Sequence, residues 1–196
     1  MTKFDKAYYD RFYESRRSRV HGPKEIGRTC TAVANIIEAT HGPIETALEV
    51  GAGTGLWRDW FVARRPKTRY RSTDVSAYAC ERYGHERRDI ANWRARGKFD
   101  LVVCQSALPY LGAADAAKAI GNLAAMTGVF LYFEATTASD IEGVADRDAT
   151  DLTMHHRTGE WYRRKLKPTF RQVGFGLWVR RDAQVPFWEL ECGPDR

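Results

Sequence analysis

Apolar and polar positions along the chain predict helices and strands in alternation. Apolar residues at helical spacing, with polar residues between them, predict helices over residues 24–40, 56–65, 77–83 and 113–126. Unbroken apolar runs predict strands, and the clearest run, residues 99–104, is typical of a central parallel strand that is buried on both faces. This alternation predicts an α/β fold with a largely parallel sheet.

The two ends of the chain depart from this alternation. Residues 4–15 carry aromatic residues on one helical face, which predicts an amphipathic helix that either covers the core or closes over a site. Residues 161–170 are expected to form the last helix, and residues 175–181 and 185–191 the two strands of a terminal hairpin. We therefore divide the chain into a helical lid over residues 1–43 and a core that comprises the rest.

The core, residues 44–196, contains a polar stretch over residues 135–167 with few apolar positions. It follows a strand that ends in Glu134, on the side of the sheet where open α/β folds bind their ligands. Long irregular segments in compact domains often carry function. We expect this insertion to lie beside the substrate.

Three glycines at alternate positions mark the first strand-to-helix junction. Gly51, Gly53 and Gly55 follow a short apolar strand and precede a helix, so they predict a tight turn that lets a ligand approach the backbone. A dinucleotide site has the spacing G-x-G-x-x-G, but Leu56 stands where its third glycine would fall. Glu49, just before the turn, would repel phosphate and favour a ligand with a positive centre.

A second acid lies at the spacing expected for a ribose contact. Asp74 ends an alternating run about 20 positions after Gly53, the distance that one crossover helix allows before the ribose-binding acid. Together the glycine turn and Asp74 predict a site for a nucleoside that lacks phosphate.

Composition sets limits on the class of protein. The chain has 196 residues, 43% hydrophobic and 29% charged, as in one globular domain, and no apolar run reaches the roughly 18 residues needed to span a bilayer. Its N-terminal residues lack an apolar signal core, so we expect a cytoplasmic protein. The four cysteines are scattered, and the net charge of +6 lies in short, separated basic runs.

The string Glu49-Val50-Gly51-Ala52-Gly53-Thr54-Gly55 resembles the first motif of class I S-adenosylmethionine-dependent methyltransferases. The resemblance implies a Rossmann-like sheet of seven strands, mostly parallel, with helices on both faces and a C-terminal antiparallel hairpin. It also implies S-adenosylmethionine as cofactor and S-adenosylhomocysteine as product. At the family's fourth motif this chain has Cys104-Gln105-Ser106-Ala107 in place of Asn/Asp-Pro-Pro-Tyr/Phe, which disfavours nucleic-acid and glutamine acceptors.

The resemblance assigns site residues by position. For Asp89 it implies a bond to the adenine amine, and the alternative is a helix N-cap. The implied cofactor-binding residues are Glu49, Gly51, Ala52, Gly53, Gly55, Asp74, Val75, Asp89, Ile90, Gln105 and Arg19. The implied substrate-binding residues are Tyr9, Tyr13, Tyr110, His156 and Trp161.

A base is needed only for a hydroxyl or a protonated amine, and His155 and Glu134 are the candidates. The acids and histidines of the insertion could also be read as a metal cluster, but we expect no metal, because adjacent histidines point apart in an extended segment. The favoured function is methylation of O or N on a small molecule by a monomer or homodimer. The alternatives are an RNA or protein methyltransferase, motivated by the pI near 9.2, and a non-catalytic cofactor-binding protein.

Overall fold

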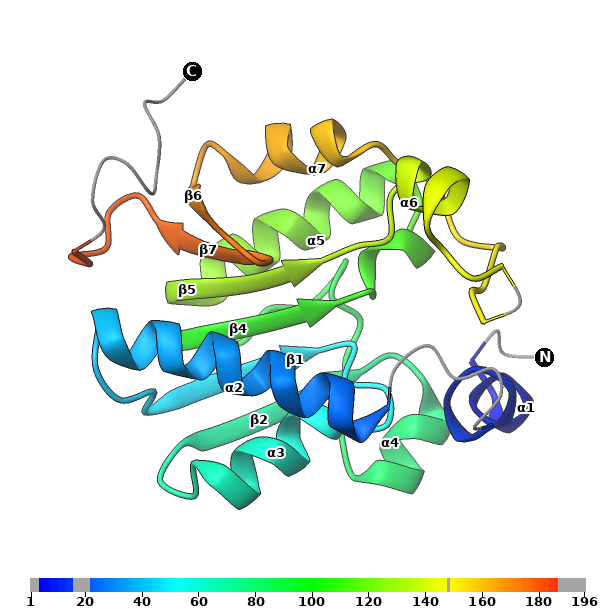
Figure 1. Ribbon diagram of the computed structural model, residues 1–196, viewed down its shortest axis with the longest axis horizontal. Helices are drawn as coiled ribbons and strands as arrows, with labels where there is room; N and C mark the ends of the chain where they lie inside the picture. The colour runs from blue at the N-terminus through cyan, green and yellow to red at the C-terminus, as the bar shows by residue number, and fades with distance from the viewer. Residues whose placement is uncertain (1–3, 16–21, 148, 187–196) are drawn as a thin grey trace.

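The computed structural model describes residues 4–15, 22–147 and 149–186. They form a seven-stranded sheet with helices on both faces (Figure 1). The strands are β1 (Thr46–Val50), β2 (Arg69–Asp74), β3 (Glu86–Arg87), β4 (Phe99–Gln105), β5 (Thr127–Glu134), β6 (Phe170–Gly174) and β7 (Leu177–Arg180). The helices are α1 (Lys6–Tyr9), α2 (Pro23–Thr40), α3 (Leu56–Arg64), α4 (Ala77–Tyr83), α5 (Ala113–Met126), α6 (Ala138–Gly143) and α7 (Gly159–Leu166), with the short turns η1 (Asp10–Glu14) and η2 (Leu108–Tyr110).

The strand order is β3-β2-β1-β4-β5-β7-β6. Strands β1 to β5 run parallel, and β7 runs antiparallel to both β5 and β6. The predicted Rossmann-like sheet with a terminal antiparallel hairpin is therefore confirmed. The order reverses between β1 and β4, which places a ligand crevice at the carboxyl ends of these two strands.

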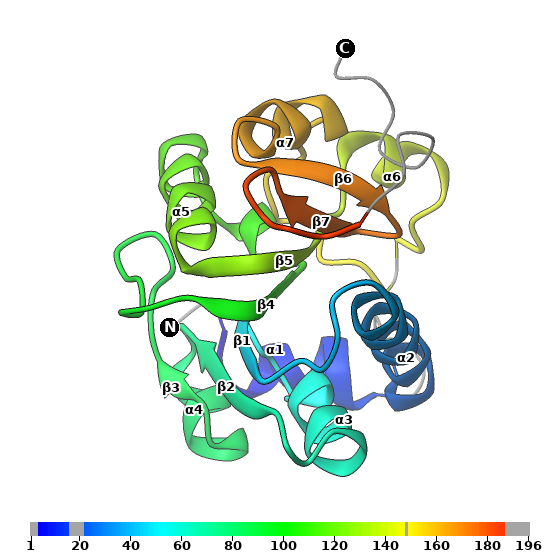
Figure 2. The same cartoon turned by 90° about the vertical axis from the view of Figure 1, so that its left-hand side faces the viewer.

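Side chains of the central strand β4 alternate between two hydrophobic clusters. Leu101 and Val103 pack beneath α2 and α3, while Val102 and Cys104 pack beneath α5 and α7, and all four are fully buried. Figure 2 shows α5 and α7 on one side of the sheet and α2 on the other. The prediction that residues 99–104 form a central buried strand is confirmed.

The hairpin lies earlier in the chain than the sequence pattern predicted. Helix α7 ends at Leu166, because Pro168 has no N–H with which to continue it, so the helix predicted to reach Phe170 was too long. Residues 170–174 are the first strand of the hairpin, and the predicted first strand is its second. Of the predicted strand 185–191, residues 185 and 186 are not in a strand and residues 187–191 lie outside the described residues. The turn consists of Phe175 and Gly176, both at positive φ, as a two-residue hairpin requires.

The N-terminal segment is less regular than the single amphipathic helix that was predicted. Helix α1 begins at the N-cap Asp5, whose carboxylate accepts from the backbone N–H of Tyr8, and gives way to the π-helical turn η1 after Tyr9. The segment lies at the carboxyl ends of the parallel strands (Figure 1). None of the helices in the described parts of the chain has the length and apolar character needed to cross a membrane.

Candidate cofactor and substrate site

The glycine turn after β1 is held by backbone hydrogen bonds to β2. The N–H groups of Gly51 and Ala52 donate to the carbonyl oxygen of Thr73 at 2.9 and 3.0 Å. Gly51, Gly53 and Gly55 all have positive φ, at 70°, 56° and 79°. Other residues would be strained in this conformation, so the local fold depends on the three glycines.

Close packing adds a second reason for glycine at position 51. A Cβ atom there would lie 2.5 Å from the Cβ of Ala107, in the loop after β4. At position 55, a Cβ would meet the guanidinium of Arg58 and the ring of His85. The turn therefore packs directly against its neighbours and leaves one open side, toward the ligand crevice.

Asp74 ends β2 beside this turn, where the sequence placed it. Its Oδ2 accepts from the N–H of Gly53 at 2.9 Å, and its Oδ1 accepts from the N–H of Ser76 at 2.8 Å. Burial raises the pKa of Asp74, and the two backbone hydrogen bonds oppose that shift. The carboxylate is thus rigidly held at the wall of the crevice.

Glu49 is a second buried carboxyl at the same junction. Only 4% of its surface is exposed, and Tyr70 donates to its Oε2 at 3.1 Å. Burial raises its pKa to about 8. In the free protein Glu49 is therefore largely protonated at neutral pH, and a cation placed against it would favour the charged form.

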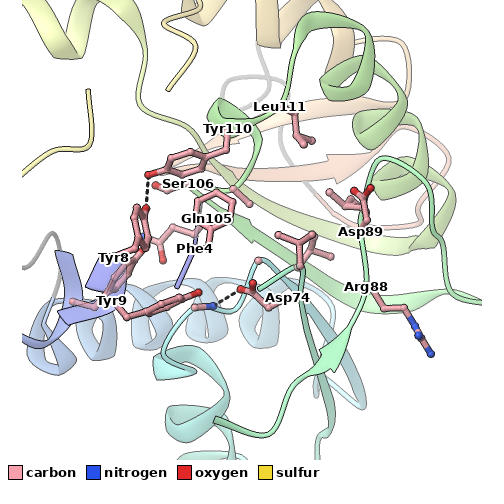
Figure 3. A pocket seen from close by; sticks show the side chains of 17 residues that line it. Phe4, Tyr8, Tyr9, Asp74, Arg88, Asp89, Gln105, Ser106, Tyr110 and Leu111 are labelled. Carbon is pink, nitrogen blue, oxygen red and sulfur yellow. Dashed lines mark hydrogen bonds between the residues drawn. The ribbon is translucent and has the colours of Figure 1, made fainter. Parts of the chain in front are cut away.

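The crevice contains a cavity of about 220 Å³ between the carboxyl ends of the strands and the N-terminal segment (Figure 3). A smaller recess of about 70 Å³ continues from it toward Glu49 and Trp57. The cavity is lined by Phe4, Tyr8, Tyr9, Tyr13, Val50, Gly51, Gly53, Asp74, Val75, Arg88, Asp89, Ile90, Gln105, Ser106, Ala107, Tyr110 and Leu111. Ala52 lines the recess, while Gly55 appears in neither lining.

Asp89 and Ile90 lie together on one wall of the cavity. Asp89 also organises its own turn, because its Oδ1 accepts from the N–H of Ala91 at 2.9 Å and its Oδ2 from the side-chain amide of Asn92 at 2.6 Å. Ile90 is 7% exposed and belongs to the core cluster beneath α5. No helix begins at Asp89 in the described residues, so the helix N-cap alternative is wrong; Asp89 instead stabilises a turn and lies at the cavity wall.

Tyrosines close the opposite side of the cavity. The hydroxyl groups of Tyr8 and Tyr110 lie 2.7 Å apart (Figure 3), and the rings of Tyr8 and Tyr13 pack against each other. The segment is attached to α4, since the hydroxyl of Ser76 donates to the carbonyl of Phe4 at 2.7 Å. Residues of the N-terminal segment thus form one wall of the cavity, and the ends of the strands form the other.

Glu134 stands behind the loop that follows β4. Its carboxylate accepts from Tyr132, from the side-chain amide of Gln105 and from the hydroxyl of Ser106, at 2.9, 3.0 and 3.3 Å. Gln105 also accepts from the indole N–H of Trp57 at 2.8 Å. Ser106 has a φ of 55°, an unusual conformation for a residue other than glycine, and such strained residues cluster at functional sites.

The remaining predicted residues lie farther from the cavity or cannot be placed. His155 and His156 are exposed, Trp161 is half-buried, and none of the three lines the cavity or the recess. The backbone N–H of His155 donates to the carbonyl of Pro109 at 2.7 Å, which brings the insertion beside η2. Arg19 lies outside the described residues.

Sequence reasoning missed His85 entirely. One ring nitrogen, Nε2, lies 3.1 Å from the carbonyl oxygen of Gly53, and Nδ1 lies 2.8 Å from the hydroxyl of Ser72. Burial lowers the pKa of His85, so the neutral ring is favoured at the base of the glycine turn. Its position after the C-cap Gly84 and before a two-residue strand gave no recognisable pattern.

The backbone matches solved methyltransferase structures over most of its length. CalS10, an amino pentose methyltransferase from Micromonospora echinaspora solved with bound S-adenosylmethionine, matches with a TM-score of 0.60 and 18% identity over 91% of this chain and 98% of that protein. NodS, an N-methyltransferase from Bradyrhizobium japonicum in complex with S-adenosylhomocysteine, matches with a TM-score of 0.57 and 18% identity over 83% of this chain and 90% of that protein. The chain has the class I methyltransferase fold.

Magnesium protoporphyrin IX methyltransferase from Synechocystis PCC 6803, with bound S-adenosylhomocysteine, shares this methyltransferase fold at a TM-score of 0.56 and 18% identity, over 90% of this chain and 96% of that protein. No family model and no curated protein matches the sequence. The methyltransferase fold is therefore recognised from the backbone, and the residues of the site carry the functional argument.

Proposed function

We propose that this chain is an S-adenosylmethionine-dependent methyltransferase that methylates O or N of a small molecule. The observation that carries the proposal is the cavity at the carboxyl ends of β1, β2 and β4, where the glycine turn meets the buried carboxylate of Asp74. Nucleoside cofactors bind at this place in open α/β sheets.

The cavity suits a nucleoside that lacks phosphate. Asp74 and Asp89 are acidic groups on its wall, and Glu49 lines the recess that continues from it. Carboxylates repel phosphate but accept hydrogen bonds from ribose hydroxyls and ammonium groups. A Cβ atom at position 53 would lie 3.8 Å from Tyr13, and both residues line the cavity as well as the recess.

The cofactor would be held at three places. Asp74 would accept from the ribose hydroxyls, Val75 and Ile90 would flank the adenine with Asp89 at its amine, and Glu49 would receive the amino-acid tail in the recess. When bound, S-adenosylmethionine supplies a methyl group on a sulfonium sulfur, and the acceptor's lone pair forms the new bond as the carbon–sulfur electron pair stays on sulfur.

The protein's own part is to orient the acceptor and exclude water. Where the acceptor must lose a proton, Glu134 and His155 are the proposed bases. Glu134 is joined by hydrogen bonds to Gln105 and Ser106 in the cavity wall, and His155 is brought near the site by its backbone bond to Pro109. Tyr110, His156 and Trp161 stay proposed substrate contacts.

Calorimetric titration of the full chain with S-adenosylhomocysteine and with NAD tests the proposal. We expect S-adenosylhomocysteine to bind and NAD to bind far more weakly. Asp74→Ala should weaken S-adenosylhomocysteine binding by roughly tenfold or more, because charge-assisted hydrogen bonds of about 1.5–3 kcal/mol are lost. Asp115→Ala, an exposed acid on α5, is the matched control and should bind like wild type. Equal binding of NAD, or no effect of Asp74→Ala, would contradict the proposal.

A further inference from the structure

The insertion between α6 and α7 brings one more carboxylate to the tyrosine side of the cavity. Asp151 is only 7% exposed, and its Oδ1 accepts from both the N–H and the hydroxyl of Thr153, at 2.9 and 2.7 Å. These bonds fix the carboxylate within its own turn. Within the described parts of the chain Asp151 forms no salt bridge, and burial of a carboxylate without a cationic partner costs free energy.

Asp151 acts on the tyrosines that line the cavity. The pKa of Tyr110 is raised chiefly by burial, and hydrogen bonding to Asp151 adds to the shift. Burial also raises the pKa of Tyr13, to about 12, and the charge of Asp151 contributes again. Asp151 itself does not line the cavity, so its influence reaches the interior through these phenols.

The hydroxyl groups then have defined directions. Hydrogen bonding to Asp151 raises the pKa of Tyr110, as expected when Tyr110 donates its single proton to that carboxyl group; the oxygen of Tyr110 then accepts from Tyr8. The hydroxyl of Tyr8 donates its one hydrogen bond to Tyr110, so the oxygen of Tyr8 can accept from a donor in the cavity. The phenols therefore present acceptor oxygens and aromatic faces, both of which attract cations.

The charged residues that line the cavity also favour a cation. Asp74 and Asp89 are acidic, and Arg88 is the one cation among the described lining residues. Arg88 points away from the other side chains in Figure 3, and its guanidinium lies over the ring of Trp93 at 5.5 Å. The interior is therefore negative although the whole chain carries a net charge of +6.

The cofactor does not account for all of this negative character. Glu49, Asp74 and Asp89 are the acids assigned to it, whereas Asp151 is hydrogen-bonded to Tyr110, on the tyrosine side of the cavity. We propose that the methyl acceptor is an amine, which binds as an ammonium against Tyr8, Tyr13 and Tyr110 with Asp151 behind them. This inference rests on the proposed function and narrows the acceptor from O or N to N.

An ammonium must release one proton before its nitrogen has a lone pair for the methyl group. That proton passes to the proposed base, Glu134 or His155, while Asp151 holds the hydroxyl of Tyr110, and through it the oxygen of Tyr8 that accepts from the ammonium. Asp151 is thus a positioning residue that acts through Tyr110. Anionic acceptors are disfavoured in the same cavity, because they would face the carboxylates without a counter-charge.

Three probes that share a tert-butyl group and differ in charge test the proposal: tert-butylammonium and tert-butanol, which are close in shape, and the anion pivalate. Each is titrated into protein saturated with S-adenosylhomocysteine, with isotope-labelled tyrosine signals as the readout. We expect tert-butylammonium to bind best and pivalate worst. Asp151→Asn should reduce the preference for the cation over the alcohol by about fivefold, the size expected for one charge at intermediate dielectric. Affinity for tert-butanol should not change.

Controls separate this proposal from the fold and from the proposed function. Asparagine at position 151 keeps the oxygen that accepts from Thr153, and Asp146→Asn removes an exposed acid of the same insertion and should behave like wild type. If Asp151→Asn does not fold, Tyr110→Phe, which removes the connecting hydroxyl and keeps the ring, should lower the cation preference instead.

Failure of S-adenosylhomocysteine to bind would overturn the proposed function. If that nucleoside binds normally but the protein shows no preference for the cation, the amine proposal alone is overturned. The same holds if none of the three probes binds. An unchanged preference in a folded Asp151→Asn variant would do the same.

Discussion

Glu49 is a carboxyl whose charge depends on what lies against it. Its pKa of about 8 is set first by burial, so the free protein holds a proton there at pH 7 and loses stability as the pH rises through that value. A ligand ammonium or sulfonium in the recess would lower this pKa. Ligand binding and proton release are therefore linked.

From this linkage we expect binding of S-adenosylhomocysteine at pH 7 to release up to one proton, and affinity to rise between pH 6 and 8. Calorimetry in two buffers of different ionisation enthalpy measures the number of protons. Glu49→Gln should bring that number close to zero. The same release in wild type and Glu49→Gln would show that another group titrates.

The sequence located the residues that bear recognisable patterns. Gly51, Gly53 and Asp74 could be placed because turn geometry and crossover length restrict their spacing. His85 and Asp151 could not, because each reaches the site through tertiary packing of a loop, and nothing in the neighbouring sequence reports it. The roles of single side chains in loops are therefore the part that a structure adds.

The N-terminal segment contributes four aromatic residues to the cavity but none to the two hydrophobic clusters of the core. Phe4, Tyr8, Tyr9 and Tyr13 line the cavity, and neither cluster contains a residue from this segment. Hydrogen bonds join it to the rest of the chain, among them those from Ser76 to Phe4, from Tyr83 to Glu14 at 3.1 Å and between Tyr8 and Tyr110. Ligand binding and global stability should therefore respond differently to its removal.

Deletion of residues 1–15 should weaken S-adenosylhomocysteine binding by roughly tenfold or more, since buried aromatic contacts contribute about 1 kcal/mol each. Unfolding should stay cooperative, because the core is intact. Calorimetry and circular dichroism during urea unfolding measure the two effects. Lys6→Ala, which removes only an exposed ion pair, serves as the control. Loss of cooperative unfolding would mean that the segment belongs to the core.

Element boundaries were the least certain part of the sequence prediction. Helix α7 ends at Leu166, two residues before Pro168, and the residues from Phe170 onward pair with β7 as a strand. The amphipathic pattern of residues 4–15 correctly indicated one buried face, yet it could not show that the helix widens to a π-turn at Asp10. Local pattern gives the type of an element more reliably than its ends.

The fold as a whole follows from two clusters that share one sheet. Strands β1, β4 and β5 send alternate side chains to each cluster, so every parallel strand in the middle is buried on both faces. A mostly parallel sheet with helices on both faces could be expected from the alternation of elements and the resemblance of the glycine motif. The packing of individual side chains within the two clusters could not be predicted from the sequence.

Phe130 tests the contribution of the core to stability. It is fully buried in the cluster beneath α2, so Phe130→Ala should lower the free energy of unfolding by about 3–5 kcal/mol. Phe175→Ala is the matched control, because that ring is 62% exposed, and it should change stability by no more than about 0.5 kcal/mol. Urea denaturation gives both values. A loss below about 1 kcal/mol for Phe130→Ala would contradict the described packing.

The close packing of Gly51 against Ala107 has a consequence for how the binding of one ligand affects the binding of the other. The loop after β4 rests on the backbone of the glycine turn, and Gln105 and Ser106 in that loop line both the cavity and the recess. Neither loop can shift without displacing the other, so the two reactants should show heterotropic cooperativity. Thermodynamic reciprocity then requires that the bound acceptor raise the affinity for the nucleoside by the same factor by which the bound nucleoside raises the affinity for the acceptor.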